Sequence, residues 1–152
     1  MVLIVVAAIL SLDQFTKFLA GAALTLNRPL PVIKGIFDLT LVHNRGAAFG
    51  ILKNQVPFFI FASIVAIYLI YKNLKAHGHN FSYSLALGLI LAGAIGNLID
   101  RVIFGYVIDF LDFRIWPVFN VADSAITIGA IMLGWHLLTP NSKLSTPNSH
   151  AS

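Results

Sequence analysis

The chain has no cysteine, no glutamate and few charged residues of any kind. Only 11% of its 152 residues are charged, whereas 58% are hydrophobic. The absence of cysteine excludes disulfides, thiolate catalysis and cysteine-ligated metals. The absence of glutamate leaves six aspartates as the only acidic side chains: Asp13, Asp38, Asp100, Asp109, Asp112 and Asp123. Any carboxylate chemistry must therefore use members of this short set.

The scarcity of charge indicates an integral membrane protein. A soluble domain carries roughly 25% charged residues, and the mean hydropathy of this chain is +0.85. At about 20 residues for each membrane crossing, a chain of this length accommodates about four crossings. The net charge of +4 comes from scattered basic residues. It is therefore compatible with anionic lipid headgroups and does not indicate nucleic-acid binding.

Four apolar stretches predict four transmembrane helices. They run from about Val2 to Leu24, Val56 to Tyr71, Tyr83 to Ile99 and Phe119 to Leu138. We expect a polar turn from Asp13 to Lys17 to interrupt the first stretch. That stretch has no basic leading region and no small-residue cleavage site, so we interpret it as a retained helix and not as a signal peptide.

The segments between the helices predict one small β-sheet. Pro29 and Pro31 break any helix between residues 25 and 55, and Ile36–Val42 is typical of a strand. We expect this region to form an extracytoplasmic sheet between helices 1 and 2, lying on the bilayer. Residues 105–117 are expected to connect helices 3 and 4, dipping into the membrane surface. Residues 1–138 then form one membrane-embedded domain, and residues 139–152 a disordered polar tail.

Two of the aspartates, Asp109 and Asp123, lie in strongly apolar sequence with no basic residue close enough in the chain to neutralise them. An ionised carboxylate costs several kcal/mol in a low-dielectric setting, so it protonates or finds a partner. Each aspartate is the natural partner of the other. Two aspartates that share one proton form an acid–base pair that can activate water against a peptide bond.

The sequence between these two aspartates favours their meeting. We expect a turn at Pro117 to fold Asp109 back against Asp123. Asn120 lies three residues before Asp123, on the same side of the fourth predicted helix. The side-chain amide of Asn120 is expected to fix the orientation of the Asp123 carboxylate. The alternative is that the two acids face separate water-filled crevices.

Other polar residues have structural interpretations beside functional ones. Asp13 and Lys17 are one helical turn apart, in the favourable order for an ion pair, which indicates a buried brace or an interfacial anchor. Asp100 is expected to be held ionised by the adjacent Arg101, again as a brace. Asn97 lies on the same helical face as these two. Asn97 and Arg101 either bind a substrate backbone or belong to the scaffold, and the pattern leaves both open.

Two further positions lie in the predicted connections. Asp112 has Arg114 close by and is interpreted as a surface residue. Asn44 is expected near the mouth of the bundle in a functional loop, with an ordinary turn as the alternative. No HExxH pattern is present, which argues against a metalloprotease. A serine protease is equally poorly supported, because the chain has no nucleophile elbow and no Ser/Lys pattern.

Five sequence blocks, in this order, resemble those of bacterial lipoprotein signal peptidases, the type II signal peptidases. They are residues 13–17 (DQFTK), 44–50 (NRGAAFG), 93–101 (GAIGNLIDR), 107–110 (VIDF) and 119–124 (FNVADS). The resemblance covers nearly all of the chain up to the polar tail. One departure is Ala92, where the family pattern leads us to expect a glycine, and it concerns packing alone.

The resemblance implies an intramembrane aspartyl endopeptidase whose catalytic pair is Asp109 and Asp123. It implies contact with substrate or support of the pair for four residues: Asn44, Asn97, Arg101 and Asn120. It implies mainly structural roles for three: Asp13, Lys17 and Asp100. The implied substrate is a prolipoprotein whose future N-terminal cysteine already carries diacylglycerol, and cleavage falls just before that cysteine. No cofactor is implied.

The resemblance also implies a location. The chain would lie in the bacterial cytoplasmic (inner) membrane, with both termini in the cytoplasm and the active site near the extracytoplasmic face. Membrane lipid and the prolipoprotein are the expected partners, and a monomer is expected because nothing requires more. The basic residues of the chain do not decide this orientation under the positive-inside rule.

Two competing hypotheses follow from the same residues. Intramembrane acids also act as proton relays, so a small proton-coupled transporter or an assembly factor is the non-enzymatic alternative. A transporter would show repeat symmetry between its halves, which is not found in the sequence. The second alternative is a peptidase that pairs Asp100, not Asp109, with Asp123.

Overall fold

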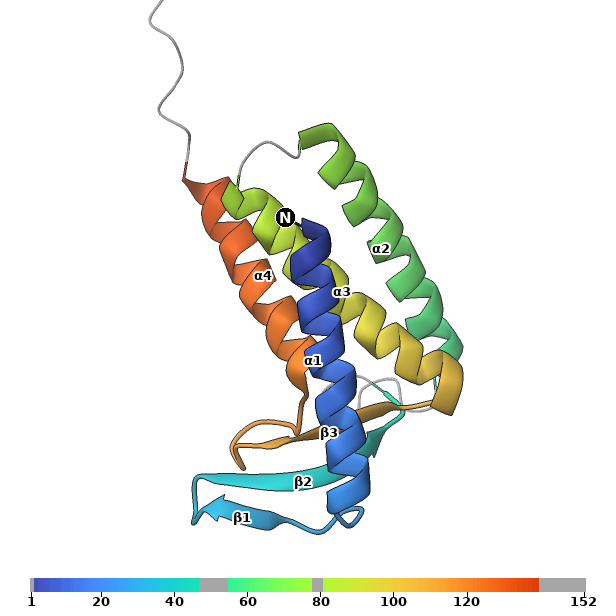
Figure 1. Ribbon diagram of the computed structural model, residues 1–152, viewed down its shortest axis with the longest axis vertical. Coiled ribbons are helices and arrows are strands. Elements are labelled where there is room, and N and C mark those ends of the chain that lie inside the picture. The colour runs from blue at the N-terminus through green and yellow to red at the C-terminus, as the bar shows by residue number, and fades with distance from the viewer. Residues whose placement is uncertain (1, 47–54, 78–80, 140–152) are drawn as a thin grey trace, which may run out of the picture.

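The structure of the protein, a computed structural model, describes residues 2–46, 55–77 and 81–139 (Figure 1). Its elements follow the order α1 (Val2–Ala23), β1 (Leu30–Ile33), β2 (Phe37–Asn44), α2 (Val56–His77), α3 (Phe81–Phe104), β3 (Val107–Asp112) and α4 (Val121–Leu138). Most of the predicted disordered tail, and residues 47–54 of the predicted sheet region, lie outside the described residues.

The described part of the chain contains four helices, all long and apolar enough to cross a membrane, which confirms the predicted number of spans. Helix α1 is unbroken through Asp13 and Lys17, so the predicted polar turn there is wrong. The two side chains form an ion pair of 2.8 Å one turn apart on the helix. Because they neutralise each other in helical geometry, the charges give the helix no reason to break.

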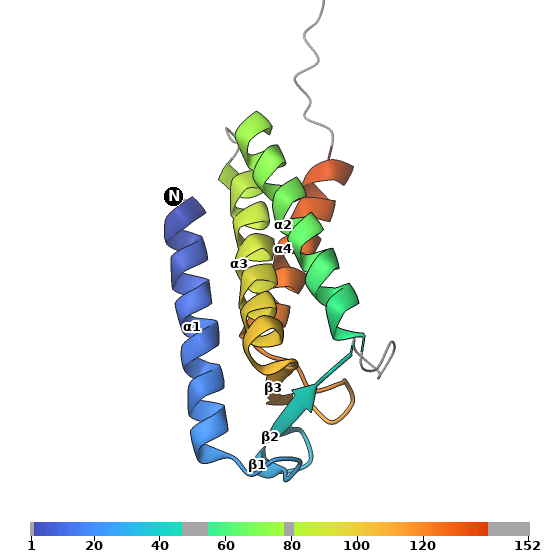
Figure 2. The same ribbon diagram turned by 90° about the vertical axis from the view of Figure 1, so that its right-hand side faces the viewer.

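Helix α3 is the centre of the bundle, in contact with α1, α2 and α4 (Figure 2). Its packing against α4 depends on glycine. A side chain at Gly93 would collide with the backbone carbonyl of Ala122, and one at Gly129 would lie 2.6 Å from the carbonyl oxygen of Ala86. The missing side chains let the two helices approach at backbone distance. This close approach sets the start of α4 against α3.

The three strands form one antiparallel sheet in the order β1-β2-β3 at one end of the bundle (Figure 1). The predicted strand is β2, displaced by one or two residues. The segment predicted to connect helices 3 and 4 does connect them, and it contains strand β3, which the sequence did not predict. Gly105, with a φ of 75°, lets the chain turn out of α3 at once. Val107 then pairs with Asn44 on β2.

Strand β3 joins the sheet to the helices. Its Phe110 packs with Ala20 of α1 and Leu41 of β2 in a buried apolar cluster. Leu111 of this strand and Phe119, which follows it in the loop before α4, exchange two backbone hydrogen bonds of 2.8 and 3.1 Å. These bonds confirm that the chain folds back on itself after β3. They hold Asp109 on the strand close to the start of α4.

Both chain ends of the bundle lie away from the sheet. The start of α1 and the end of α4 are at the opposite end of the helices from the strands (Figure 1). The residues predicted to be functional lie near the sheet. A membrane that covers the four helices therefore leaves the sheet at one of its surfaces.

Candidate active site

The first turn of α4 fixes the position of Asp123. The side-chain oxygen of Asn120 accepts the backbone N–H of Asp123 at 2.8 Å, and Asp123 Oδ2 accepts the backbone N–H of Asn120 at 3.3 Å. This reciprocal capping box places a carboxylate at a helix N-terminus, where negative charge is stabilised. Asn120 thus orients Asp123 through its carbonyl and backbone, and not through its amide as we predicted.

The Asp109 carboxylate is held by two amides. Asn120 Nδ2 donates to Oδ1 at 2.7 Å, and Asn44 Nδ2 donates to Oδ2 at 2.9 Å. Asn44 is fixed in turn by the backbone N–H of Gly46 at 2.9 Å. Asn44 therefore lies at the site, as the sequence predicted for the mouth of the bundle.

Burial changes the acidity of Asp109, which is only 1% exposed. Loss of solvation raises the pKa of its carboxyl to about 7, and the negative charge of Asp123 acts in the same direction. The hydrogen bonds from Asn44 and Asn120 oppose this rise in pKa, because they stabilise the ionised form. Near neutral pH, Asp109 can therefore both hold and release a proton.

Asn97 of α3 is the direct partner of Asp123. Its Nδ2 donates to Asp123 Oδ1 at 2.8 Å. Its Oδ1 accepts from Asn120 Nδ2 at 3.1 Å and from Lys17 Nζ at 3.0 Å. Asn97 and Asn120 thus connect the two aspartates through a network of side-chain amides, and the Lys17 ammonium donates to this network at the Asn97 carbonyl. The sequence did not predict this link to Lys17, because the lysine lies on a different helix.

The two aspartates open on one cavity of about 310 Å³. Five residues predicted to be functional line it, together with Thr127, which was not predicted: Asn44, Asn97, Arg101, Asp109 and Asp123. The Arg101 guanidinium lies 5.1 Å from the ring centre of Phe59, a cation–π contact. The cavity therefore combines two acids, amide donors and one cation behind an apolar rim.

Part of the apolar rim was missed in the sequence. Phe59 of α2 and Trp116, in the loop between β3 and α4, both line the cavity. Trp116 and Pro117 stand just before the block that contains Asp123, which is the one signal that points to them. Phe59 carries no such signal, because it is one of many aromatic residues in an apolar helix.

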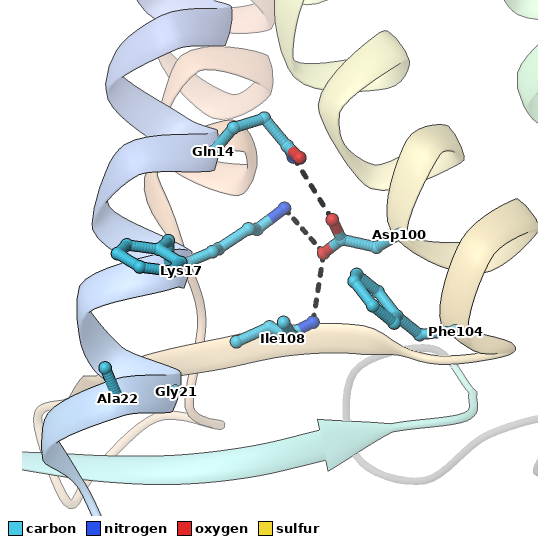
Figure 3. Close-up of a pocket in the computed structure, with 8 residues that line it drawn as sticks. Gln14, Lys17, Gly21, Ala22, Asp100, Phe104 and Ile108 are labelled. Atoms are coloured by element: carbon cyan, nitrogen blue, oxygen red, sulfur yellow. Dashed lines mark hydrogen bonds and ion pairs between the residues drawn. The ribbon is translucent and has the colours of Figure 1, made fainter.

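A second polar cluster lies between α1 and α3 (Figure 3). Lys17 Nζ contacts Asp13 at 2.8 Å, as predicted, and Asp100 at 2.9 Å. The predicted pairing of Asp100 with Arg101 is wrong, because adjacent residues on a helix point about 100° apart. Gln14, which the sequence did not single out, donates to Asp100 at 3.1 Å. We call Asp13, Gln14, Lys17 and Asp100 the lysine cluster.

The lysine cluster ties three helices and the sheet together. Asp13 Oδ1 accepts the backbone N–H of Ala122 on α4 at 2.9 Å. Asp100 Oδ2 accepts the backbone N–H of Ile108 on β3 at 3.1 Å (Figure 3). Asp100 lines a separate cavity of about 500 Å³ with Gln14 and others. This position separates Asp100 from the cavity of Asp109 and Asp123.

Asp112 is half-buried on β3, and its contact with Arg114 differs from the prediction. Its carboxylate accepts the Thr40 hydroxyl at 2.8 Å and the backbone N–H of Arg114 at 2.8 Å. The Arg114 side chain instead lies 3.4 Å from Asp38. Within the described part of the chain, no three His or Asp side chains gather as a metal ion would require.

The chain is similar to several known proteins. A family model described as signal peptidase (SPase) II matches residues 5–139. A lipoprotein signal peptidase of Caldanaerobacter subterraneus subsp. tengcongensis is 53% identical over 91% of this chain and 96% of its own. One from Halothermothrix orenii is 50% identical over 88% of this chain and 92% of its own.

Solved structures are similar as well. A bacterial membrane enzyme solved at 2.3 Å resolution is 32% identical, with a TM-score of 0.89 over 97% of this chain and 94% of that one. Another, solved at 1.9 Å, is 33% identical, with a TM-score of 0.84 over 91% of this chain and 93% of that one.

Proposed function

The chain belongs to the signal peptidase II family, and on that premise we propose that Asp109 and Asp123 are the catalytic pair of a lipoprotein-processing peptidase. Members of this family are aspartic-type peptidases that cross the bacterial membrane several times. The protein therefore removes signal peptides from prolipoproteins. The proposal rests above all on one observation: the buried Asp109 and the half-buried Asp123 open on one cavity. Among the described residues, neither of them makes an ion pair.

The first step uses the two aspartates in opposite protonation states. Ionised Asp123 takes a proton from a water molecule in the cavity while the water oxygen attacks the carbonyl carbon of the scissile peptide bond. Protonated Asp109 gives its proton to the carbonyl oxygen. The product is a neutral gem-diol, and Asp109 is now the ionised member. The raised pKa of Asp109 supports this role, because the acid must hold its proton near neutral pH.

The second step reverses these roles. Asp109 takes a proton from one hydroxyl of the gem-diol as its carbonyl re-forms, and the C–N bond breaks. Asp123 delivers the proton that it took from water to the leaving amine. Both aspartates return to their starting states, and the net change is the addition of one water to one peptide bond. No further acid or base is needed.

The remaining cavity residues supply substrate contacts. Arg101 and Asn97 border the aspartates and carry N–H donors suited to the backbone carbonyls of an extended peptide. The rim residues Phe59 and Trp116 offer apolar surface at the membrane boundary. We assign to this rim the segment around the scissile bond, with a diacylglyceryl cysteine just after it and the acyl chains in the bilayer. Cleavage then falls immediately before the lipidated cysteine.

The orientation follows from the same assignment. The sheet and the aspartate cavity lie at the extracytoplasmic face of the cytoplasmic membrane, and both termini lie in the cytoplasm. The shared end of α1 and α4 supports this placement of the termini (Figure 1). Residues 1–138 act as a single domain, and the enzyme works as a monomer surrounded by membrane lipid.

The test is cleavage of a purified diacylglyceryl-prolipoprotein by the reconstituted enzyme, followed by mass spectrometry. Asp109→Asn and Asp123→Asn should each lower kcat by about 10³-fold, the loss typical when a general acid or base is removed. Asp112→Asn is the matched control. It removes a carboxylate from the same strand as Asp109 but outside the cavity, and should cleave at close to the wild-type rate.

Three other results would contradict parts of this proposal. Retained cleavage by either Asn variant overturns the assignment of the pair. Cleavage by Asp109→Asn together with an inert, folded Asp100→Asn variant favours a peptidase that pairs Asp100 with Asp123. If the wild-type enzyme leaves the lipidated precursor uncut, the peptidase proposal itself fails, and a proton-coupled transporter becomes the better interpretation of the buried acids.

A further inference from the structure

The side-chain amide of Asn97 has only one possible orientation. Its Oδ1 faces two groups that can only donate, the Lys17 ammonium at 3.0 Å and the Asn120 Nδ2 at 3.1 Å. A flipped amide would direct its N–H groups at these donors. The Nδ2 of Asn97 must therefore face the other way, toward Asp123 Oδ1 at 2.8 Å. Asn97 is 5% exposed, so water does not compete for these contacts.

Lys17 is as firmly placed as Asn97. Its ammonium has three protons, and three acceptors surround it: Asp13 at 2.8 Å, Asp100 at 2.9 Å and Asn97 at 3.0 Å. The side chain is 2% exposed. Figure 3 shows it directed from α1 toward Asp100 on α3. A saturated, buried ammonium of this kind holds its acceptors in one arrangement.

The carbonyls of the two amides that bind Asp109 do not accept from this ammonium, although the charge of Lys17 also lowers the pKa of Asp109 as the weakest of the influences on it. The Asn44 carbonyl accepts from the Gly46 backbone at 2.9 Å, and the Asn120 carbonyl accepts from the Asp123 backbone at 2.8 Å. These donors are neutral. Only the amide that faces Asp123 is polarised by a full positive charge, so its N–H is the stronger donor to a carboxylate.

We infer that Lys17 is a positioning residue for peptide cleavage, which acts through Asn97 to keep Asp123 the ionised acid of the pair while Asp109 holds the proton. The inference rests on the proposed function and adds to it the distribution of charge at rest. The position of Asp123 in the first turn of α4 acts in the same direction, because a helix N-terminus stabilises negative charge. Asp109 lies in a strand and lacks that contribution.

Other charged groups near Asp123 must be considered in any pH dependence. Arg101 faces it from α3 and Asp109 from β3. Two further carboxylates lie on the far side of Lys17, namely Asp13 from α1 and Asp100 from α3. Arg101 favours ionised Asp123, whereas the three carboxylates oppose it. Lys17 is the group whose removal changes both the charge and the orientation of the amide.

The experiment measures kcat and KM for lipidated precursor across pH, in wild type and in Lys17→Met. The acid limb of kcat reports protonation of the base, Asp123. Without the cation this limb should move up by about 1 pH unit, the lower end of the shift that a nearby opposite charge produces. On that limb kcat falls about tenfold. KM should not change, because Lys17 does not line the cavity of the two aspartates.

Asp100→Asn is the matched control. It removes a carboxylate from the same ammonium and weakens the lysine cluster, but it leaves the contacts from Lys17 to Asn97 and from Asn97 to Asp123 in place. Its acid limb should not move to higher pH. Lys17→Arg keeps the positive charge and the donors, so its acid limb should lie nearer to the wild-type position than that of Lys17→Met.

The outcomes are distinguishable. A purely structural role for Lys17 would lower kcat by the same factor at every pH and leave the limb in place, which overturns the inference. If Lys17→Met cannot be purified folded, the variant Lys17→Met with Asp100→Asn is measured in its place, because it removes one charge of each sign and should shift the limb in the same direction. Failure of the wild type to cut the precursor would instead overturn the proposed function.

Discussion

Two groups of aspartates lie side by side near the sheet, and they differ in the charge of their partners. In the lysine cluster, Asp13 and Asp100 share one ammonium at 2.8 and 2.9 Å. Asp109 and Asp123 instead accept from side-chain amides and a backbone N–H. The charge of a carboxylate beside a buried cation is compensated by that cation, whereas a carboxylate that faces neutral donors can exchange a proton.

This difference distinguishes the aspartates that stabilise the fold from those proposed to act in catalysis, although the two groups are neighbours in space. The lysine cluster holds α1, α3 and α4 in place, and in the described residues its oxygens are satisfied by the chain itself. The aspartate pair opens on a cavity. Asn97 touches both groups, through its carbonyl on one side and its amide on the other. A buried charge of structural origin can therefore act on the neighbouring reactive acids.

Asp13→Ala should have the largest effect on stability. It deprives the Lys17 ammonium of its nearest carboxylate and the Ala122 N–H of its acceptor. Breaking a buried pair in this way costs about 3–5 kcal/mol of unfolding free energy. Unfolding in detergent or lipid, measured against Asp109→Ala as the control, checks the value. An equal loss in both variants would contradict the structural contrast between the two groups.

Gly96→Ala should have an intermediate effect. A Cβ at this position would lie 2.6 Å from Asp13 Oδ2, so the carboxylate must move away from the ammonium. Overpacking of this kind costs about 1–3 kcal/mol. Gly21→Ala is the matched control, because no atom lies within 4 Å of the added methyl group. Thermal unfolding should show a loss for Gly96→Ala alone. A loss for Gly21→Ala as large as that for Gly96→Ala would contradict the contact with Asp13 as the cause.

Asn44→Ala should have the smallest effect of the three variants, a shift in the pH dependence of kcat. Cleavage requires protonated Asp109, so kcat should fall as pH rises through its pKa of about 7. The Asn44 hydrogen bond lowers that pKa, and its loss should therefore move the alkaline limb to higher pH. Thr40→Val on the same strand is the control, since Thr40 donates to Asp112. A limb that stays in place or moves to lower pH would contradict this assignment of the acid.

Local patterns predicted the parts of this molecule that depend on neighbours in sequence. The four apolar stretches correspond to the four spans, and the spacing of Asp13 and Lys17 predicted their ion pair. The separation of Asn120 and Asp123 indicated a contact at the start of α4, although the capping geometry reversed the roles of amide and carbonyl.

Contacts between distant segments could not be predicted in the same way. The pairing of Asp100 with Lys17 crosses from α3 to α1, and adjacency in sequence suggested Arg101 instead. Strand β3 was missed because a short apolar run is equally typical of a connection. The segment becomes a strand because it pairs with β2. Phe59 and Trp116 became part of the site only when their elements met at the cavity.

Composition and spacing alone settle that this chain crosses a membrane, that its acid chemistry is confined to six aspartates and that the blocks around Asp109 and Asp123 resemble those of one peptidase family. The folded structure decides which aspartates lie beside the Lys17 ammonium and which accept hydrogen bonds from side-chain amides. The physical reason is that the protonation of a buried carboxylate depends on the donors within a few ångströms, and those donors come from helices and strands far apart in the chain.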